Sequence, residues 1–181
     1  MRTPSLITLA ILILAGMMPL SLQADYLKNT DFKEGSQCWR GDGQAVFLRP
    51  DGTEGAEGDK GVIPVLKITL SRSQPRCVYQ EFPTKDAPGK LHIRVEAFAS
   101  ADFKRSSRSS AYQMDDYMPI TDFMIRSMPD YDDKTSDLKP GEWVTVDSKW
   151  EALTPADNRA VYFFVPPGEG KVYIKNPSVT P

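Results

Sequence analysis

The chain has 181 residues, 22 lysines and arginines, 24 aspartates and glutamates, and a formal net charge of −2. So little net charge gives no electrostatic attraction to nucleic acid or to anionic lipid, so no nucleic-acid partner is expected. The 12 glycines and 15 prolines are spread between short apolar runs, which argues against a helical protein.

The first residues are predicted to be a secretory signal peptide. Arg2 precedes an apolar run from Leu6 to Leu20, and the small residue Ala24 then offers a cleavage point. The run is short for a membrane span and no second one follows, although an uncleaved anchor is the alternative. We expect a signal peptide at 1–24, a single β-sandwich domain at 25–181, no membrane span after cleavage, and a secreted or periplasmic location.

The rest of the chain alternates apolar and polar residues in short segments, with no convincing amphipathic helix. In the cleanest segment Leu91, Ile93, Val95, Ala97 and Ala99 share one face. This rhythm predicts an all-β fold: a two-sheet antiparallel β-sandwich of the jelly-roll type, with the first and last strands adjacent. The expected strands are 25–32, 44–48, 62–71, 76–82, 91–99, 120–128, 142–153, 159–165 and 171–179.

The chain has two cysteines, Cys38 and Cys77. In an exported protein the default expectation is one disulfide between them, worth about 4 kcal/mol in the chain-entropy model. Two buried thiols are the alternative. Zinc is not expected, because two cysteines and the single histidine, His92, are too few ligands and match no zinc spacing.

Three stretches in this order resemble a known family: "LKNTDFKEG" before Trp39, then "VYQEFPT…PGKLHIRVEAFAS", then "GEWVTVDSKWEALTPADNRAVYFFVPPGEGKVYIKNPSV". They are similar to the carbohydrate-binding modules of the CenC type, families 4 and 9 and relatives. The resemblance spans nearly all of 25–181 and implies a galactose-binding-domain-like β-sandwich. It also implies structural roles for Trp39, Trp143 and Trp150.

The same resemblance bears on calcium, which the family often holds between its first and last strands. Lys33 and Lys175 stand where the family has acidic residues. An ammonium group offers no oxygen ligand and repels a cation, so we expect the calcium site to be lost and no cofactor to be required. Asp31 and Glu34 remain as acids that can pair with either lysine.

Two surfaces are candidates for sugar contact, which needs flat apolar rings and a few polar groups. On the outward face of 91–99, Arg94 and Glu96 are expected to bind hydroxyls while Phe98 or Tyr162 stacks on a ring. The second surface is the segment 109–119, with Tyr112 and Tyr117. The alternatives are a solvated sheet face and an ordinary exposed loop.

The sequence therefore predicts a secreted, non-catalytic protein whose partner is a polysaccharide or oligosaccharide. The runner-up is a protein–protein interaction or structural β-sandwich module without a glycan ligand, with another protein as its partner. A small lyase or hydrolase is the third hypothesis; no nucleophile motif or triad pattern points to it.

Calcium is expected to leave the stability of the protein unchanged, because lysines replace two oxygen ligands of the family's site. Scanning calorimetry with and without micromolar Ca²⁺ tests this expectation. A clear rise in melting temperature on adding calcium would refute it.

Overall fold

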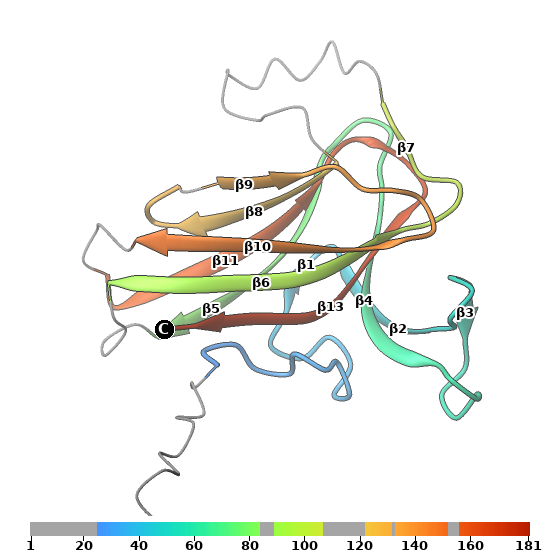
Figure 1. The fold of residues 1–181 in the computed structure, drawn as a ribbon, viewed down its shortest axis with the longest axis horizontal. Helices are drawn as coiled ribbons and strands as arrows, with labels where there is room; N and C mark the ends of the chain where they lie inside the picture. The colour runs from blue at the N-terminus through green and yellow to red at the C-terminus, as the bar shows by residue number, and fades with distance from the viewer. Residues whose placement is uncertain (1–24, 84–88, 107–121, 132, 152–155) are drawn as a thin grey trace, which may run out of the picture.

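The computed structural model describes residues 25–83, 89–106, 122–131, 133–151 and 156–181. Within these residues no helix is long and apolar enough to cross a membrane. The predicted signal peptide, Tyr112 and Tyr117 lie outside the described residues. The strands are β1 (Arg40–Gly41), β2 (Gly43–Leu48), β3 (Glu54–Gly55), β4 (Ile63–Thr69), β5 (Arg76–Pro83), β6 (Lys90–Ala99), β7 (Lys104–Arg105), β8 (Phe123–Met128), β9 (Asp133–Ser136), β10 (Trp143–Glu151), β11 (Asn158–Val165), β12 (Gly168–Glu169) and β13 (Lys171–Thr180) (Figure 1).

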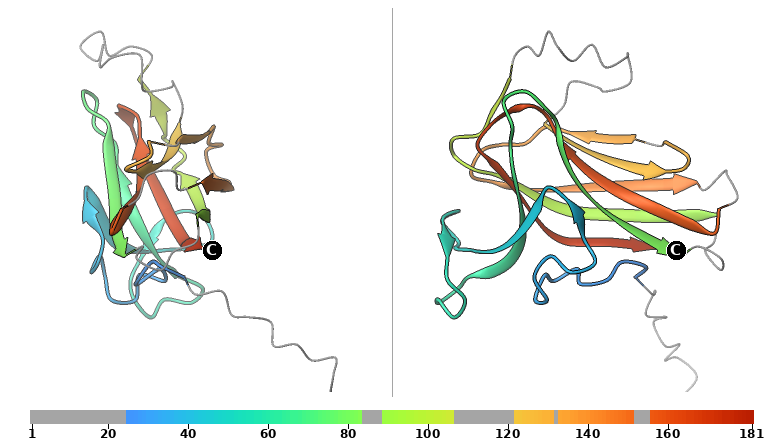
Figure 2. Two further views of the ribbon diagram at one scale, coloured as in Figure 1. Left: turned by 90° about the vertical axis from the view of Figure 1, so that its left-hand side faces the viewer. Right: turned by 180° about the vertical axis from the view of Figure 1, so that it is seen from behind.

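Two large antiparallel sheets form a sandwich, which confirms the predicted fold class. One sheet has five strands in the order β1-β5-β11-β8-β9, and the other has six in the order β10-β6-β13-β4-β2-β3. The strands β7 and β12 pair separately. Seen from behind in the right panel of Figure 2, the green β5 and the orange-red β11 lie in front of β6 and β10.

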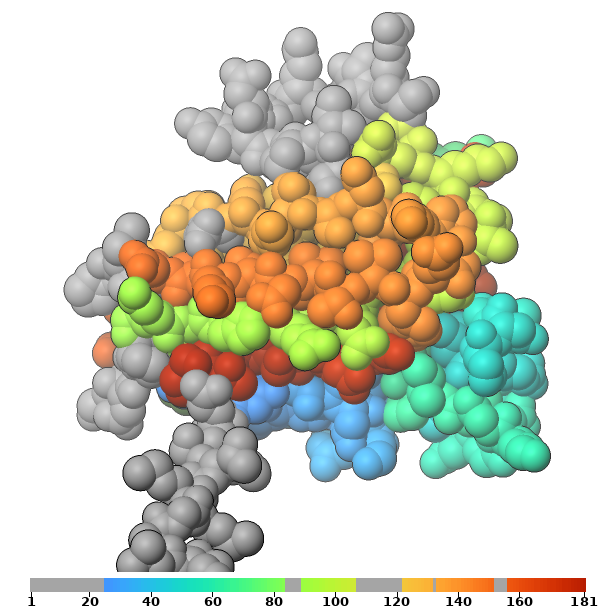
Figure 3. All heavy atoms as spheres, viewed as in Figure 1, coloured from blue at the N-terminus to red at the C-terminus, as the bar shows by residue number. Residues whose placement is uncertain are grey.

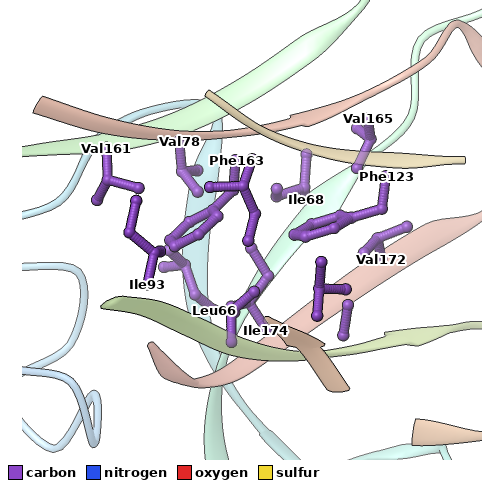
Figure 4. Packing of buried hydrophobic residues seen from close by; sticks show 14 of the residues in the cluster. Leu66, Ile68, Val78, Ile93, Phe123, Val161, Phe163, Val165, Val172 and Ile174 are labelled. Carbon is purple, nitrogen blue, oxygen red and sulfur yellow. The ribbon is translucent and has the colours of Figure 1, made fainter. Parts of the chain in front are cut away.

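The core fills the space between the two sheets, and the predicted alternation places its residues. Phe163 of β11 stacks on Phe123 of β8, with ring centroids 6.0 Å apart. Figure 4 shows both rings between the sheets, with Ile93 and Ile174 contributed by the six-stranded sheet. The apolar residues predicted for one face of 91–99 are all buried here.

The two ends of the domain lie side by side, as predicted, although residues 25–32 are not a strand. The N–H of Tyr26 donates to the carbonyl of Val179 at 2.9 Å, and the blue N-terminal segment runs past the end of β13 in Figure 1. Left-handed φ angles at Asn29 (48°) and Phe32 (53°) interrupt the extended backbone that a strand requires. The predicted adjacency of the first and last strands is not formed: the first strand, β1, belongs to the five-stranded sheet and β13 to the six-stranded sheet.

The predicted disulfide is not formed: Cys38 and Cys77 are both free. The reason is the register of β1 on β5, in which the N–H of Asp42 donates to the carbonyl of Cys77 at 2.8 Å. Cys38 comes four residues earlier, outside β1, so this pairing does not bring it beside Cys77.

The outer face of the six-stranded sheet is charged, and its side chains pair with one another. The ammonium group of Lys175 lies 3.1 Å from a Glu96 oxygen and 4.0 Å from the centre of the Trp143 ring. His92 contacts Asp147 at 2.6 Å between Nε2 and Oδ1. Figure 3 shows this face, with β10, β6 and β13 as three bands side by side.

A second, smaller core lies on the same outer face, which the sequence pattern did not predict. Leu48, Val65, Phe98 and Tyr173 form it, with Val46 and Trp143 packed against them. The turn between β2 and β3 closes over the Phe98 ring at Gly52, whose φ of 82° and tight contact leave no room for a side chain. Two of the three tryptophans expected to be structural, Trp39 and Trp150, are buried in the main core.

A buried ion pair holds the connection between β8 and β9. Arg159 points inward from β11 and pairs with Asp130, and both side chains are at most 5% exposed. The indole N–H of Trp150 donates to the same carboxylate at 3.2 Å, and the Arg159 guanidinium lies 5.0 Å from the centre of the indole ring. Removing one member of such a pair leaves an uncompensated buried charge.

We therefore expect Asp130→Ala to lower the free energy of unfolding by about 3–5 kcal/mol, measured by urea denaturation. The control is Asp31→Ala, which removes an exposed carboxylate paired with Lys33 and is expected to leave the midpoint almost unchanged. Similar midpoints for the two variants would contradict the structural role of the buried pair.

Candidate functional site

The outer face of the five-stranded sheet carries the aromatic side chains that β5 and β11 do not bury. In β11 the odd-numbered residues Val161, Phe163 and Val165 face the core, so Tyr162 and Phe164 face outward. The same alternation in β5 buries Val78 and Phe82 and turns Tyr79 outward. Each of the three outward rings is only partly buried.

Strand register places five side chains in one line across this face, which we call the transverse row. Arg40 is opposite Tyr79, Tyr79 is opposite Tyr162, Tyr162 is opposite Arg126, and Arg126 is opposite Asp133. Neighbouring strands are about 4.8 Å apart, so the row spans about 19 Å.

The middle of the row is a flat apolar surface. Tyr79 and Tyr162 stack with centroids 4.7 Å apart and ring planes at 17°, and Tyr162 stacks on Phe164 at 5.7 Å and 16°. We call these three rings the aromatic platform. Burial, and next the proximity of Tyr79, raise the pKa of Tyr162. An ordinary tyrosine hydroxyl is already protonated at neutral pH, so a raised pKa leaves it a hydrogen-bond donor.

One end of the row holds an arginine in a fixed position. Arg126 donates from Nε and Nη2 to the two carboxylate oxygens of Asp133, both at 2.7 Å. This hydrogen bonding raises the pKa of Arg126. The guanidinium also lies 5.7 Å from the Phe164 ring centre and 6.0 Å from that of Tyr131, which is 64% exposed. Donors and an exposed ring therefore border the platform.

The other end is more loosely held. Arg40 and Glu81 approach each other only to 3.7 Å, and their side chains are 67% and 54% exposed. Exposed pairs of this kind contribute little to stability, so both groups can turn toward a ligand. The face therefore combines apolar rings with charged donors and acceptors on either side, the arrangement that sugar recognition requires.

The structure separates the residues predicted for the first sugar-binding surface. Tyr162 lies on the five-stranded sheet, whereas Arg94, Glu96 and Phe98 lie on β6 of the six-stranded sheet. Glu96 is occupied by Lys175 and by the side-chain amide of Asn176, at 2.9 Å. Sugar binding by exposed Arg94 and by Glu96 stays a prediction.

The prediction that Phe98 stacks on a sugar ring is wrong, because only 5% of this residue is exposed. It was expected to stack on a sugar because its position in the alternation of 91–99 is outward. The alternation is right, but the β2–β3 turn covers the ring and leaves no face for a ligand.

Sequence reasoning included Tyr162 but missed Tyr79, Phe164, Arg126 and Asp133. The signal was present in "RAVYFFV", since an inward Val161, Phe163 and Val165 require an outward Tyr162 and Phe164. Nothing in the sequence indicated that β11 lies between β5 and β8, and that strand order brings the other residues together.

No group of three or more His, Cys, Asp or Glu side chains in the described part of the chain is arranged to hold a metal ion. The two lysines expected to replace calcium ligands each pair with an acid: Lys33 with Asp31 at 2.8 Å, and Lys175 with Glu96. Loss of the calcium site remains a prediction, which the calorimetric test addresses.

The solved structures that resemble this fold are mostly carbohydrate-binding modules. The module TmCBM61 in complex with β-1,4-galactotriose matches with a TM-score of 0.54 and 13% identity over 86% of this chain and 97% of that one. The C-terminal family 22 module of Clostridium thermocellum Xyn10B matches with a TM-score of 0.54 and 12% identity, over 86% and 94%. The arabinose-bound α-L-arabinofuranosidase MgGH51 matches with a TM-score of 0.58 and 7% identity, over 88% of this chain and 26% of the enzyme.

No protein-family model matches the chain, and no curated protein is similar to it in sequence. Identities this low show a shared fold alone. The β-sandwich of this chain is thus the fold found in carbohydrate-binding modules, as the resemblance in sequence implied.

The stacking of Tyr79 on Tyr162 in the aromatic platform can be tested without a ligand, by measuring the coupling free energy between the two residues. We expect the double-mutant cycle of Tyr79→Ala and Tyr162→Ala to give a coupling of about 0.5–1.5 kcal/mol in the free energy of unfolding. Tyr79→Ala combined with Arg94→Ala on the other sheet is the control and should be additive. Equal couplings in the two cycles would show that the rings do not stack.

Proposed function

We propose that this protein binds carbohydrate without cleaving it, through the outer face of its five-stranded sheet. The observation that carries the proposal is the aromatic platform at the centre of the transverse row. The platform offers flat apolar surface to the C–H faces of sugar rings, and the groups at the two ends of the row offer hydrogen bonds to hydroxyls.

The position of each group suits a glycan lying across the strands. A row of about 19 Å is longer than a single sugar ring and presents its apolar part in the middle. Arg126, held by two hydrogen bonds to Asp133, is a donor that needs little further ordering on binding. The ligand class that fits is therefore an oligosaccharide or polysaccharide rather than a monosaccharide.

The placement of the carboxylates supports binding rather than hydrolysis. Glu81 of β5 and Asp133 of β9 are three strand spacings apart and offset by two residues along the strands, so their backbones are about 16 Å apart. Pairs of carboxylates in glycoside hydrolases lie about 5–10 Å apart. Each of these two acids is also paired with an arginine, which suits the binding of hydroxyl groups.

The proposed place of action is outside the cytoplasm, in the periplasm or surroundings of the cell. This part of the proposal depends on the predicted signal peptide at 1–24. In that location the protein would meet extracellular or cell-envelope glycans, which are long enough to cover the transverse row.

Glycan-array screening followed by calorimetry tests the binding face. Tyr162→Ala is expected to weaken glycan binding about ten-fold or more, because the ring at the centre of the platform is lost. Tyr162→Phe keeps the ring and should retain most of the affinity. Arg94→Ala on the opposite face is the matched control and should bind as the wild type does.

Loss of binding in Arg94→Ala but not in Tyr162→Ala would move the site to the six-stranded sheet. Failure of the wild-type protein to bind any glycan, together with a defined protein partner, would support the protein-interaction alternative. Turnover of an oligosaccharide would contradict the non-catalytic role.

A further inference from the structure

A pocket of about 440 Å³ opens at the β1 edge of the five-stranded sheet; we call it the edge pocket. Its size is within the range of about 300–1,000 Å³ that is usual for ligand sites. The N-terminal segment, the turn before β1 and strand β5 supply its walls. They include Lys28, Cys38, Trp39, Arg40, Gln80 and Glu81.

The pocket exists because β1 is much shorter than β5. Pairing with β5 begins at Arg40, and the chain before it turns away through Cys38, whose φ is 69°. The bond from Asp42 N–H to the Cys77 carbonyl fixes which main-chain groups of β5 face this edge. By alternation, the N–H and C=O of Glu81 face the same edge, beyond the first residue of β1.

Gln80 gives the pocket a fixed wall. Its side chain is buried, accepts from the N–H of Lys28 at 2.6 Å, and donates to the carbonyl of Lys28 at 3.0 Å. These two bonds hold the backbone of the N-terminal segment against β5. The lysine side chain is therefore presented at the pocket from an anchored position.

The edge pocket adjoins the end of the transverse row, because Arg40 belongs to both. Glu81 also belongs to the pocket, and it lies two residues along β5 from Tyr79, on the same outward face. A glycan that crosses the platform toward β1 therefore reaches the pocket with its end.

The charges in the pocket favour an anion. Lys28 and Arg40 are two cations against the single carboxylate of Glu81. Among the described residues Lys28 has no acidic partner within ion-pair distance, and the Arg40–Glu81 contact is long and exposed. A ligand carboxylate or sulfate would give both cations a partner without displacing a strong ion pair.

We propose that the edge pocket is a subsite for an acidic sugar residue at the end of a glycan lying on the transverse row. This inference rests on the proposed carbohydrate-binding function and adds the charge class of the ligand. Lys28 and Arg40 pair with the acidic group, while the carboxylate and main chain of Glu81 bind hydroxyls.

The test uses arrays of β-1,4-linked gluco-, manno- and galacto-oligosaccharides, each in neutral, C6-carboxylate and 6-sulfate forms. We expect the wild-type protein to bind an acidic form of at least one series about three- to ten-fold more tightly than its neutral form. Carboxylate and sulfate forms compared within one series identify the source of the charge.

Lys28→Gln is expected to remove that preference and to leave binding of the neutral form unchanged, because Lys28 is outside the transverse row. Arg72→Gln is the matched control for Arg40→Gln, since Arg72 is likewise an exposed arginine in a surface ion pair but does not line the pocket. Equal binding of neutral and acidic forms overturns the acidic subsite and leaves the proposed function standing. If the acidic preference survives both Lys28→Gln and Arg40→Gln, the acidic subsite is not in the edge pocket. If the wild-type protein binds none of the series, in neutral or acidic form, the proposed function itself is overturned.

Discussion

The register of β11 between β5 and β8 is the constraint on which the rest of this structure depends. The burial of Val161, Phe163 and Val165 in the core fixes which face of β11 is inward. Because side chains alternate, a slip of one residue would bury Tyr162 and Phe164 and expose the core. The same pairing therefore sets the stability of the sheet and the composition of the proposed binding face, and it forms the transverse row on the outer side.

The two outer faces of the sandwich differ in charge pairing and in exposed aromatic surface, and this difference supports the proposed binding face. On the six-stranded sheet, charges such as Lys175 and Glu96 neutralise one another, and the β2–β3 turn covers the remaining aromatic surface over Phe98. On the five-stranded sheet the rings stay partly exposed, and the arginines and acids lie at the ends of the row. The edge pocket extends this second face toward the N-terminal segment.

The sequence predicted the long strands, which hydrophobic periodicity encodes, and missed the features that depend on which strands pair with one another. Long strands such as β6 and β11 were found with bounds accurate to a residue, because their apolar residues recur every second position. Two-residue strands such as β1 have no period to detect, yet the register of β1 places Asp42 rather than Cys38 beside Cys77. The alternation of apolar and polar residues also predicts which face of the sheet a side chain lies on, but not which loop covers it. The prediction that Phe98 contacts a sugar was wrong for this reason. The platform needed the strand order β5-β11-β8, and local sequence does not contain it.

The most direct test of the central claim is an NMR titration of protein with ¹³C-labelled tyrosine rings, using the glycan that binds best. The ring signals of Tyr79 and Tyr162 should shift with saturation, because a sugar on the platform contacts both. Tyr173, buried on the opposite sheet, provides an internal reference that should not move. Shifts at Tyr173 with Tyr79 and Tyr162 unchanged would contradict the assignment of the five-stranded sheet as the binding face.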